Sequence, residues 1–194
     1  MDDTGKCIAD AGGVADAMKY LVDIKAAGAT LTPDYNVMAD GFKDGTYDLI
    51  IDGPWALGGY RDAIANLGVA EMPAGPTGPA KPLLGVDGFY INASSPNIDL
   101  AAEFALAMTS AESQRVWTDV GGHVPADTTV QVADEHVAAF AGTAPNTVPR
   151  PQVKELDNFW SNFGDAQAKV TETGADPVAT VAAACAAMNT ANNK

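Results

Sequence analysis

The sequence predicts an α/β fold in which helices outnumber strands. Apolar residues recur at helical spacing through most of the chain. Three short apolar runs bounded by turn residues are typical of strands: Tyr47–Asp52, Gly68–Met72 and Gly85–Ala93. The 194 residues are 47% hydrophobic, which is enough for a core and excludes wholesale disorder. We therefore expect an α/β or α+β arrangement, as one domain or one domain plus a piece of another.

Three helices are predicted in the first part of the chain. The first runs from Asp10, a residue type that caps helices, to about Ala27, and Gly28 ends it. A shorter helix covers residues 32–42. A third is expected over residues 56–66, directly after the first predicted strand.

Five more helices are predicted in the second part. Proline suits the first helical position, so Ser94-Ser95-Pro96 and Asp176-Pro177 are good helix starts. Two loops rich in helix breakers, Pro73–Pro82 and Gly142–Pro151, interrupt the periodic segments. The predicted helices cover residues 97–109, 111–120, 132–141, 155–171 and 177–189.

The charge of the chain restricts its partners. The formal net charge is -14, from 25 acidic and 11 basic residues, so nucleic acid or an anionic lipid surface would be repelled. Neutral and cationic ligands are allowed. No apolar run is long enough to span a membrane, and the first six residues are not typical of a signal peptide.

Two cysteines, Cys7 and Cys185, lie near opposite ends of the chain and fit no zinc-binding spacing. They are either unpaired core residues or a disulfide between the first and last elements. The sequence leaves both alternatives open. A disulfide over so long a loop would stabilise the fold by at most about 4–5 kcal/mol in the chain-entropy model.

The sequence carries no motif of an enzyme or a metal site. His123 and His136 have no carboxylate or cysteine at metal-ligand spacing, and there is no nucleophile elbow or P-loop. Asp48 and Asp52 could form a glycosidase pair. Two acids around a short apolar strand more often mark its solvated ends. We expect no catalysis, no metal and no cofactor.

The tryptophans carry the functional signal. Trp117 lies mid-helix between apolar residues, which predicts a core position. Trp55 follows the Gly-Pro that ends a predicted strand, and Trp160 stands near the start of a helix. Ligands of open α/β sheets bind beyond the carboxyl ends of strands, and an indole there offers a flat face to a pyranose. Trp55 either faces such a cleft, which we favour, or packs under a neighbouring helix.

Four segments, in this order, resemble the extracellular solute-binding proteins of carbohydrate ABC importers, of the maltose/maltodextrin-binding type. They are Tyr47–Ala56 (YDLIIDGPWA), Lys81–Val86 (KPLLGV), Tyr90–Asn97 (YINASSPN) and Asp157–Trp160 (DNFW). The resemblance implies a periplasmic-binding-protein-like type II fold. The chain would cover about the second half of such a protein, as a truncated chain, a proteolytic fragment or an unusual gene product.

The resemblance also implies a division into lobes. Residues 1–84 and 143–194 would belong to the C-terminal lobe, and residues 85–142 to the N-terminal lobe. The hinge crossings would lie near Gly85–Asp87 and near Ala141–Asn146. Because most of the N-terminal lobe is absent, we expect weak sugar binding and self-association or domain swapping through the surface that this lobe would cover.

Four positions match the sugar-binding residues of the resembled family. Trp55 and Trp160 match two stacking tryptophans, Tyr35 matches a tyrosine that lines the site, and Arg150 lies where a loop reaches the cleft. One position departs from the pattern. Gly164 stands four residues after Trp160, where the maltodextrin binders carry an arginine, so the sugar or the occupied subsite could differ.

The resemblance implies a function without covalent chemistry. The chain would bind a mono- or oligosaccharide and deliver it to the membrane permease of an ABC importer, outside the cell, in the periplasm or at the cell surface. Three alternatives stay open: a solute-binding protein for a ligand other than sugar, a glycoside-active enzyme domain, and a structural or interaction domain with no sugar role.

Overall fold

The computed structural model describes all 194 residues, and the chain divides into two compact units. Unit 1 comprises Met1–Met38 and Pro151–Lys194, and unit 2 comprises Ala39–Arg150. Both ends of the chain therefore belong to unit 1. The lobe boundaries that the resemblance implies stay a prediction.

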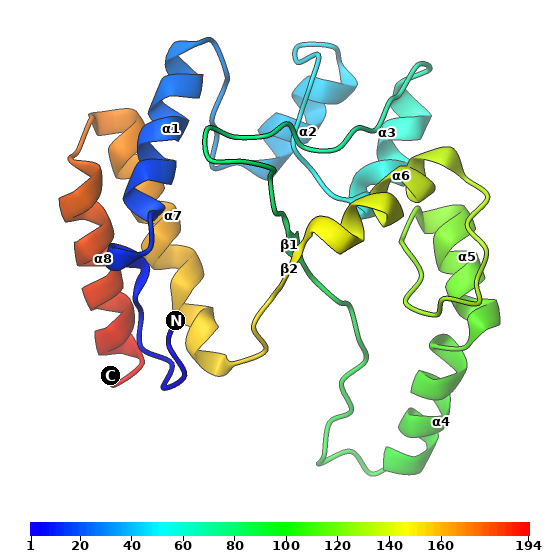
Figure 1. Cartoon of the computed structure of the whole chain (residues 1–194). Helices are drawn as coiled ribbons and strands as arrows, with labels where there is room; N and C mark the ends of the chain where they lie inside the picture. Colours follow the sequence, from blue (N-terminus) through cyan, green and yellow to red (C-terminus); the bar gives the residue numbers. More distant parts are fainter. The chain divides into compact units, whose positions relative to one another are not determined.

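Three long helices build unit 1. These are α1 (Val14–Ala26), α7 (Asp157–Thr173) and α8 (Pro177–Ala191), which pack side by side (Figure 1). Two 3-10 turns, η1 (Ala9–Ala11) and η4 (Lys154–Leu156), precede α1 and α7. The core between the helices consists of Cys7, Met18, Phe163, Ala166, Val170, Val181, Ala184, Cys185 and Met188.

The helix ends of unit 1 follow local chemistry. The carboxylate of Asp176 accepts the N–H of Ala179 at 2.8 Å, so α8 begins at Pro177 as predicted. Gly174 follows α7 with φ +71°, a left-handed conformation that favours glycine. The predicted start of the first helix is wrong. Asp10 lies in η1, and α1 begins after Gly13, whose φ is +78°.

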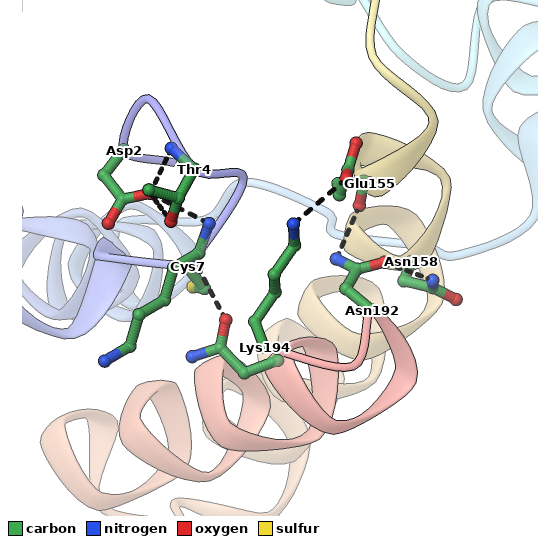
Figure 2. Close-up of polar contacts among 9 residues, drawn as sticks. Asp2, Thr4, Cys7, Glu155, Asn158, Asn192 and Lys194 are labelled. Carbon is green, nitrogen blue, oxygen red and sulfur yellow. Dashed lines mark hydrogen bonds and ion pairs between the residues drawn. The ribbon is translucent and has the colours of Figure 1, made fainter.

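A disulfide between Cys7 and Cys185 joins the N-terminal segment to α8, with Cα atoms 5.5 Å apart. Of the two alternatives that the sequence left open, the structure has the bridge. The backbone N–H of Cys7 also donates to Oδ1 of Asn189 at 2.7 Å (Figure 2). The first residues of the chain are thus held on the last helix by a covalent bond and a hydrogen bond.

Polar contacts tie the end of α8 to the start of α7. Asn192 donates from Nδ2 to the carbonyl oxygen of Glu155 at 3.0 Å and accepts Nδ2–H of Asn158 at 2.7 Å. Lys194 and Glu155 form an ion pair at 3.4 Å (Figure 2). These contacts occupy carbonyl and side-chain groups that the two helix ends would otherwise leave to water.

Unit 2 consists of short helices and one two-residue strand pair. The strands pair in parallel, Leu83 with Val148 and Leu84 with Pro149. Helix α3 packs on α5, and α4 also packs on α5. Helix α2 (Tyr35–Lys43) spans the boundary between the units. The other elements of unit 2 are η2 (Pro54–Ala56), α3 (Leu57–Ala63), β1 (Leu83–Leu84), α4 (Ile98–Met108), α5 (Ala111–Gly121), α6 (Glu135–Thr143), η3 (Ala144–Asn146) and β2 (Val148–Pro149).

None of the three predicted strands forms. Residues 47–52, 68–72 and 85–93 have no strand or helix (Figure 1). Leu49 is 88% exposed, and Ile51 is 67% exposed. A strand requires a neighbour that pairs with its N–H and C=O groups, and no segment of this chain pairs with these runs. An apolar run alone was therefore insufficient evidence for a strand.

Asp134 links α6 to α3. Its Oδ1 accepts the N–H groups of His136 at 2.9 Å and Val137 at 3.0 Å, which caps α6, and it forms an ion pair with Arg61. The Nε2 atom of His136 lies 2.9 Å from the carbonyl oxygen of Leu67. Burial raises the pKa of Asp134, but the Val137 N–H, the Arg61 charge and the His136 N–H together hold it below the ordinary value.

The disulfide should contribute strongly to stability. We expect the double variant Cys7→Ser, Cys185→Ser to lower the free energy of unfolding by about 2–5 kcal/mol, because the unfolded chain gains freedom. Urea unfolding with and without dithiothreitol measures the difference. The reductant should lower the midpoint of the wild-type protein and leave that of the double variant unchanged. A fully reduced wild-type protein with an unshifted midpoint would contradict the prediction.

Asp134 should make stability depend on acid pH. Because folding depresses its pKa, its contribution is present above the unfolded value of about 3.9 and is lost as pH falls through the lower folded value. Asp134→Asn should therefore be less stable than wild type at pH 6, with a smaller gap near pH 2.5. Urea midpoints at the two pH values measure the gap, and the exposed Asp165→Asn serves as the control. A gap of equal size at both pH values would refute the assignment.

Candidate ligand-binding site

Trp55 lies on a tight turn between an extended segment and α3. Gly53 is extended, with φ -118° and ψ 174°, and Pro54 begins the 3-10 turn η2. The N–H of Ala56 donates to the carbonyl oxygen of Gly53 at 3.2 Å. The Trp55 side chain is 63% exposed. Of the two alternatives for this residue, packing under a neighbouring helix is therefore wrong.

Asp52 fastens the turn to α3. Its Oδ1 accepts the N–H of Gly53 at 2.8 Å, and its Oδ2 accepts the hydroxyl of Tyr60 at 2.5 Å. Tyr60 is 5% exposed, and its ring meets Phe42 of α2 edge-to-face with centroids 5.1 Å apart. The sequence did not predict the contact between Asp52 and Tyr60. The available signal was a tyrosine eight residues after an aspartate that precedes Gly-Pro, within reach once the chain turns back.

Trp160 lies in the first turn of α7 and is half-exposed. Its ring meets that of Phe159 edge-to-face at 5.3 Å. Phe159 in turn stacks on Phe163 of the unit 1 core, with centroids 4.6 Å apart. A row of aromatic rings thus connects the exposed indole to the core of its helix bundle and limits the directions in which the indole can move.

The other two predicted site residues lie at the ends of elements. Tyr35 is the first residue of α2 and is half-exposed. Arg150 follows β2, is exposed, and donates its backbone N–H to the carbonyl oxygen of Leu84 at 2.9 Å. Trp55 and Arg150 belong to unit 2, and Tyr35 and Trp160 to unit 1. The convergence of all four on one cleft stays a prediction.

The predicted core position of Trp117 is wrong. Its side chain is 46% exposed, near the end of α5, and its ring meets His123 edge-to-face at 5.6 Å. The neighbouring Val116 and Val120 are exposed as well, whereas Thr118 is buried. An apolar stripe on a helix is buried only where another element covers it, and the stripe of Val116, Trp117 and Val120 stays exposed.

Asp48 and Asp52, the acids that could form a glycosidase pair, have different surroundings. Asp48 is exposed, and the Asp52 carboxylate accepts the two hydrogen bonds that hold the turn. Both oxygens of Asp52 therefore serve to hold the backbone and Tyr60 in place, whereas the paired acids of a glycosidase face the substrate. No group of three or more His, Cys, Asp or Glu side chains gathers in a metal-binding arrangement.

Residues 1–142 match the family model described as bacterial extracellular solute-binding protein. The chain belongs to this family. The match covers well over half of the sequence, and it includes Tyr35, Trp55 and the turn around Gly53. The family is one of binding proteins rather than of enzymes, and the resemblance noted from the sequence is confirmed.

Individual relatives bind oligosaccharides. The maltooligosaccharide ABC transporter solute-binding lipoprotein of Streptococcus pneumoniae is 28% identical over 131 residues, 64% of this chain and 31% of the lipoprotein. The galactooligosaccharide-binding protein of Bacillus subtilis is 25% identical over 172 residues, 85% of this chain and 41% of that protein.

A solved structure confirms the fold class. The Thermus thermophilus maltotriose binding protein, bound with maltotriose, superposes with a TM-score of 0.83 at 28% sequence identity. The superposition covers 91% of this chain and 49% of that protein. The chain thus spans half or less of the length of these relatives. The α/β solute-binding-protein fold that the sequence predicts is correct, although the only strands of this chain are β1 and β2, which pair with each other.

The exposure of Trp55 predicts that the residue is dispensable for folding. Trp55→Ala should change the free energy of unfolding by less than about 1 kcal/mol, because surface substitutions have small effects. The nearby Leu57 is 2% exposed, so Leu57→Ala should cost about 2–5 kcal/mol. Urea unfolding of the two variants measures both values. Equal losses would show that Trp55 has a structural role and would favour the interaction-domain alternative.

Proposed function

We propose that this chain is the saccharide-binding part of an extracellular solute-binding protein that serves a carbohydrate ABC importer. The observation that carries the proposal is the exposed indole of Trp55, fixed on a hydrogen-bonded turn in a chain of this family. The ligand class that fits is a maltose-like oligosaccharide. It is supported by relatives whose names give maltooligosaccharides, galactooligosaccharides and maltotriose.

The proposed binding mechanism is reversible stacking. A pyranose has an apolar C–H face and a rim of hydroxyl groups. The indoles of Trp55 and Trp160 would stack on such faces, while the Arg150 guanidinium and the Tyr35 hydroxyl would bond to the rim. Ordered water would satisfy the remaining hydroxyls. Each of the four side chains is at least partly exposed, so each can reach a ligand without local unfolding.

Two observations decide which sugars the proposal names. Gly164 is exposed on α7, one turn after Trp160, and supplies no side-chain hydrogen-bond donor where the maltodextrin binders carry an arginine. The relatives also differ in their sugars, at 25–28% identity. The proposal therefore names an oligosaccharide of the maltose type as the first ligand to test, with galactooligosaccharides second.

The proposed partners follow from the family. The ligand would be handed to a membrane permease at the outer face of a membrane, and the related lipoprotein is named as part of such a transporter. No helix of this chain combines the length and apolar character needed to cross a bilayer. Self-association or domain swapping through the surface that the rest of the N-terminal lobe would cover stays a prediction.

Saccharide binding should be weak and should depend on both tryptophans. We expect saturation-transfer NMR to detect maltotriose, with a dissociation constant weaker than micromolar because the chain spans only half of its binding relatives. Trp55→Ala and Trp160→Ala should each weaken binding about tenfold or more, which is about 1.4 kcal/mol. Galactobiose and trehalose, titrated in parallel, rank the sugars.

Trp117→Phe provides the matched control, since Trp117 is comparably exposed but lies outside the proposed site. Its affinity for maltotriose should equal that of wild type. Unchanged affinity in both alanine variants would refute the stacking role, and a submicromolar wild-type affinity would contradict the expected weakness. Absence of saturation transfer from every sugar tested would refute the proposed ligand class.

A further inference from the structure

We propose that Gly53, Asp52 and Tyr60 form a positioning device that holds the indole of Trp55 with one chosen face toward solvent. None of the three needs to touch a ligand. They would act through Trp55, by deciding which ring face is open and how firmly the ring is held. The effect of this positioning on saccharide affinity rests on the function proposed above, whereas the positioning of the indole does not.

The first part of the device is direct contact between Gly53 and the indole. Gly53 is buried although it lies on an exposed turn. A Cβ added to it would overlap with three consecutive atoms of the Trp55 six-membered ring, Cε3, Cζ3 and Cη2, at similar separations. An atom that is nearly equidistant from several ring atoms lies over the ring face, not at its edge. One face of the indole therefore rests on the Gly53 backbone.

The need for glycine at this position is steric. Gly53 has φ -118° and ψ 174°, which any residue adopts without strain. Only the closeness of the ring excludes a side chain. Since the indole is 63% exposed with one face covered, the opposite face is the one available for stacking. The residue before the Pro-Trp pair thus selects the face.

The second part is the hydrogen-bond pair that fixes Gly53 itself. The Asp52 carboxylate receives the Gly53 N–H on one oxygen and the Tyr60 hydroxyl on the other. Tyr60 is buried in α3, against Phe42. Because a hydrogen bond in a partly buried site resists displacement by water, the surface on which the indole rests is tied to the interior of unit 2.

The consequence is preorganisation. A free surface tryptophan samples several side-chain rotamers, and binding would have to select one of them at a cost in conformational entropy. A ring that already rests on a fixed backbone has lost this conformational entropy during folding, so ligand binding does not lose it again. The device would therefore raise affinity without adding a contact to the ligand, and it would make the orientation of the indole insensitive to the presence of ligand.

The test reads the ring directly. With 5-fluorotryptophan incorporated, the protein gives fluorine resonances from Trp55, Trp117 and Trp160, and Trp55→Phe assigns the first. Gly53→Ala should shift or broaden the Trp55 resonance, because the added methyl displaces the ring. Tyr60→Phe should do the same by freeing Asp52, while keeping the aromatic packing. The other two resonances should not move, which shows that the fold is intact.

Two matched controls accompany these variants. Gly68→Ala adds a methyl in open space at an ordinary φ, and Tyr90→Phe removes a hydroxyl from an exposed ring. Neither should alter the Trp55 resonance. A Trp55 resonance that is identical in wild type, Gly53→Ala and Tyr60→Phe would overturn the positioning role. So would equal shifts in the control variants.

The same samples separate this inference from the proposed function. The fluorine spectra are recorded first without sugar, where they depend on positioning alone, and then with maltotriose. Perturbed spectra together with weakened maltotriose binding in both variants support the device and its use. Perturbed spectra with no maltotriose binding by wild type support the device and overturn the saccharide proposal. Unperturbed spectra with normal binding overturn the device and leave the saccharide proposal standing.

Discussion

The structure depends on the packing of both chain ends into one helical core. Helices α1, α7 and α8 bury a common set of side chains, and the Cys7–Cys185 bridge fixes the N-terminal segment to α8. The first and last parts of the sequence form unit 1 together, and the residues between them form unit 2. The chain therefore passes from unit 1 to unit 2 once and returns once. The candidate site residues are divided between the two units for this reason.

The exposed tryptophans forgo hydrophobic stabilisation, and folding alone does not explain why they are exposed. An indole in water forgoes roughly 25 cal/mol of hydrophobic stabilisation for each Å² that burial would have covered. Trp55 nevertheless stands out of the surface on a turn reinforced by Asp52 and Tyr60, and Trp160 stands out on a row of rings. Firm support beneath an exposed apolar face is the arrangement that a binding surface needs and that a folding core does not.

Local signals predicted the helices well and the strands badly. Each predicted helix was found, and the cap at Asp176 is present, because capping involves only neighbouring residues. The predicted helix start at Ser94-Ser95-Pro96 is wrong, since α4 begins at Ile98 and Asn97 makes no side-chain cap. The sequence predicts a strand over Tyr47–Asp52, yet no strand forms there, and Leu49 and Ile51 are largely exposed. Strand formation depends on a partner segment elsewhere in the sequence, and no local pattern reports that segment.

The candidate site was predictable only in part. Exposure of Trp55 and Trp160 followed from their positions after a Gly-Pro turn and at a helix start. The same reasoning failed for Trp117, because periodicity locates an apolar stripe without showing what covers it. The hydrogen bond from Tyr60 to Asp52 joins two residues on opposite sides of a turn, and its existence depends on how the chain bends between them.

The bridge between Cys7 and Cys185 has a topological consequence. With a sequence separation of 178 residues between its cysteines, it closes most of the polypeptide into a covalent ring. One backbone scission inside that ring, for example in the proline-rich loop before β1, opens it but releases no fragment. Such a nicked molecule keeps its mass apart from one added water, and it divides into two polypeptides only after the sulfur–sulfur bond is reduced.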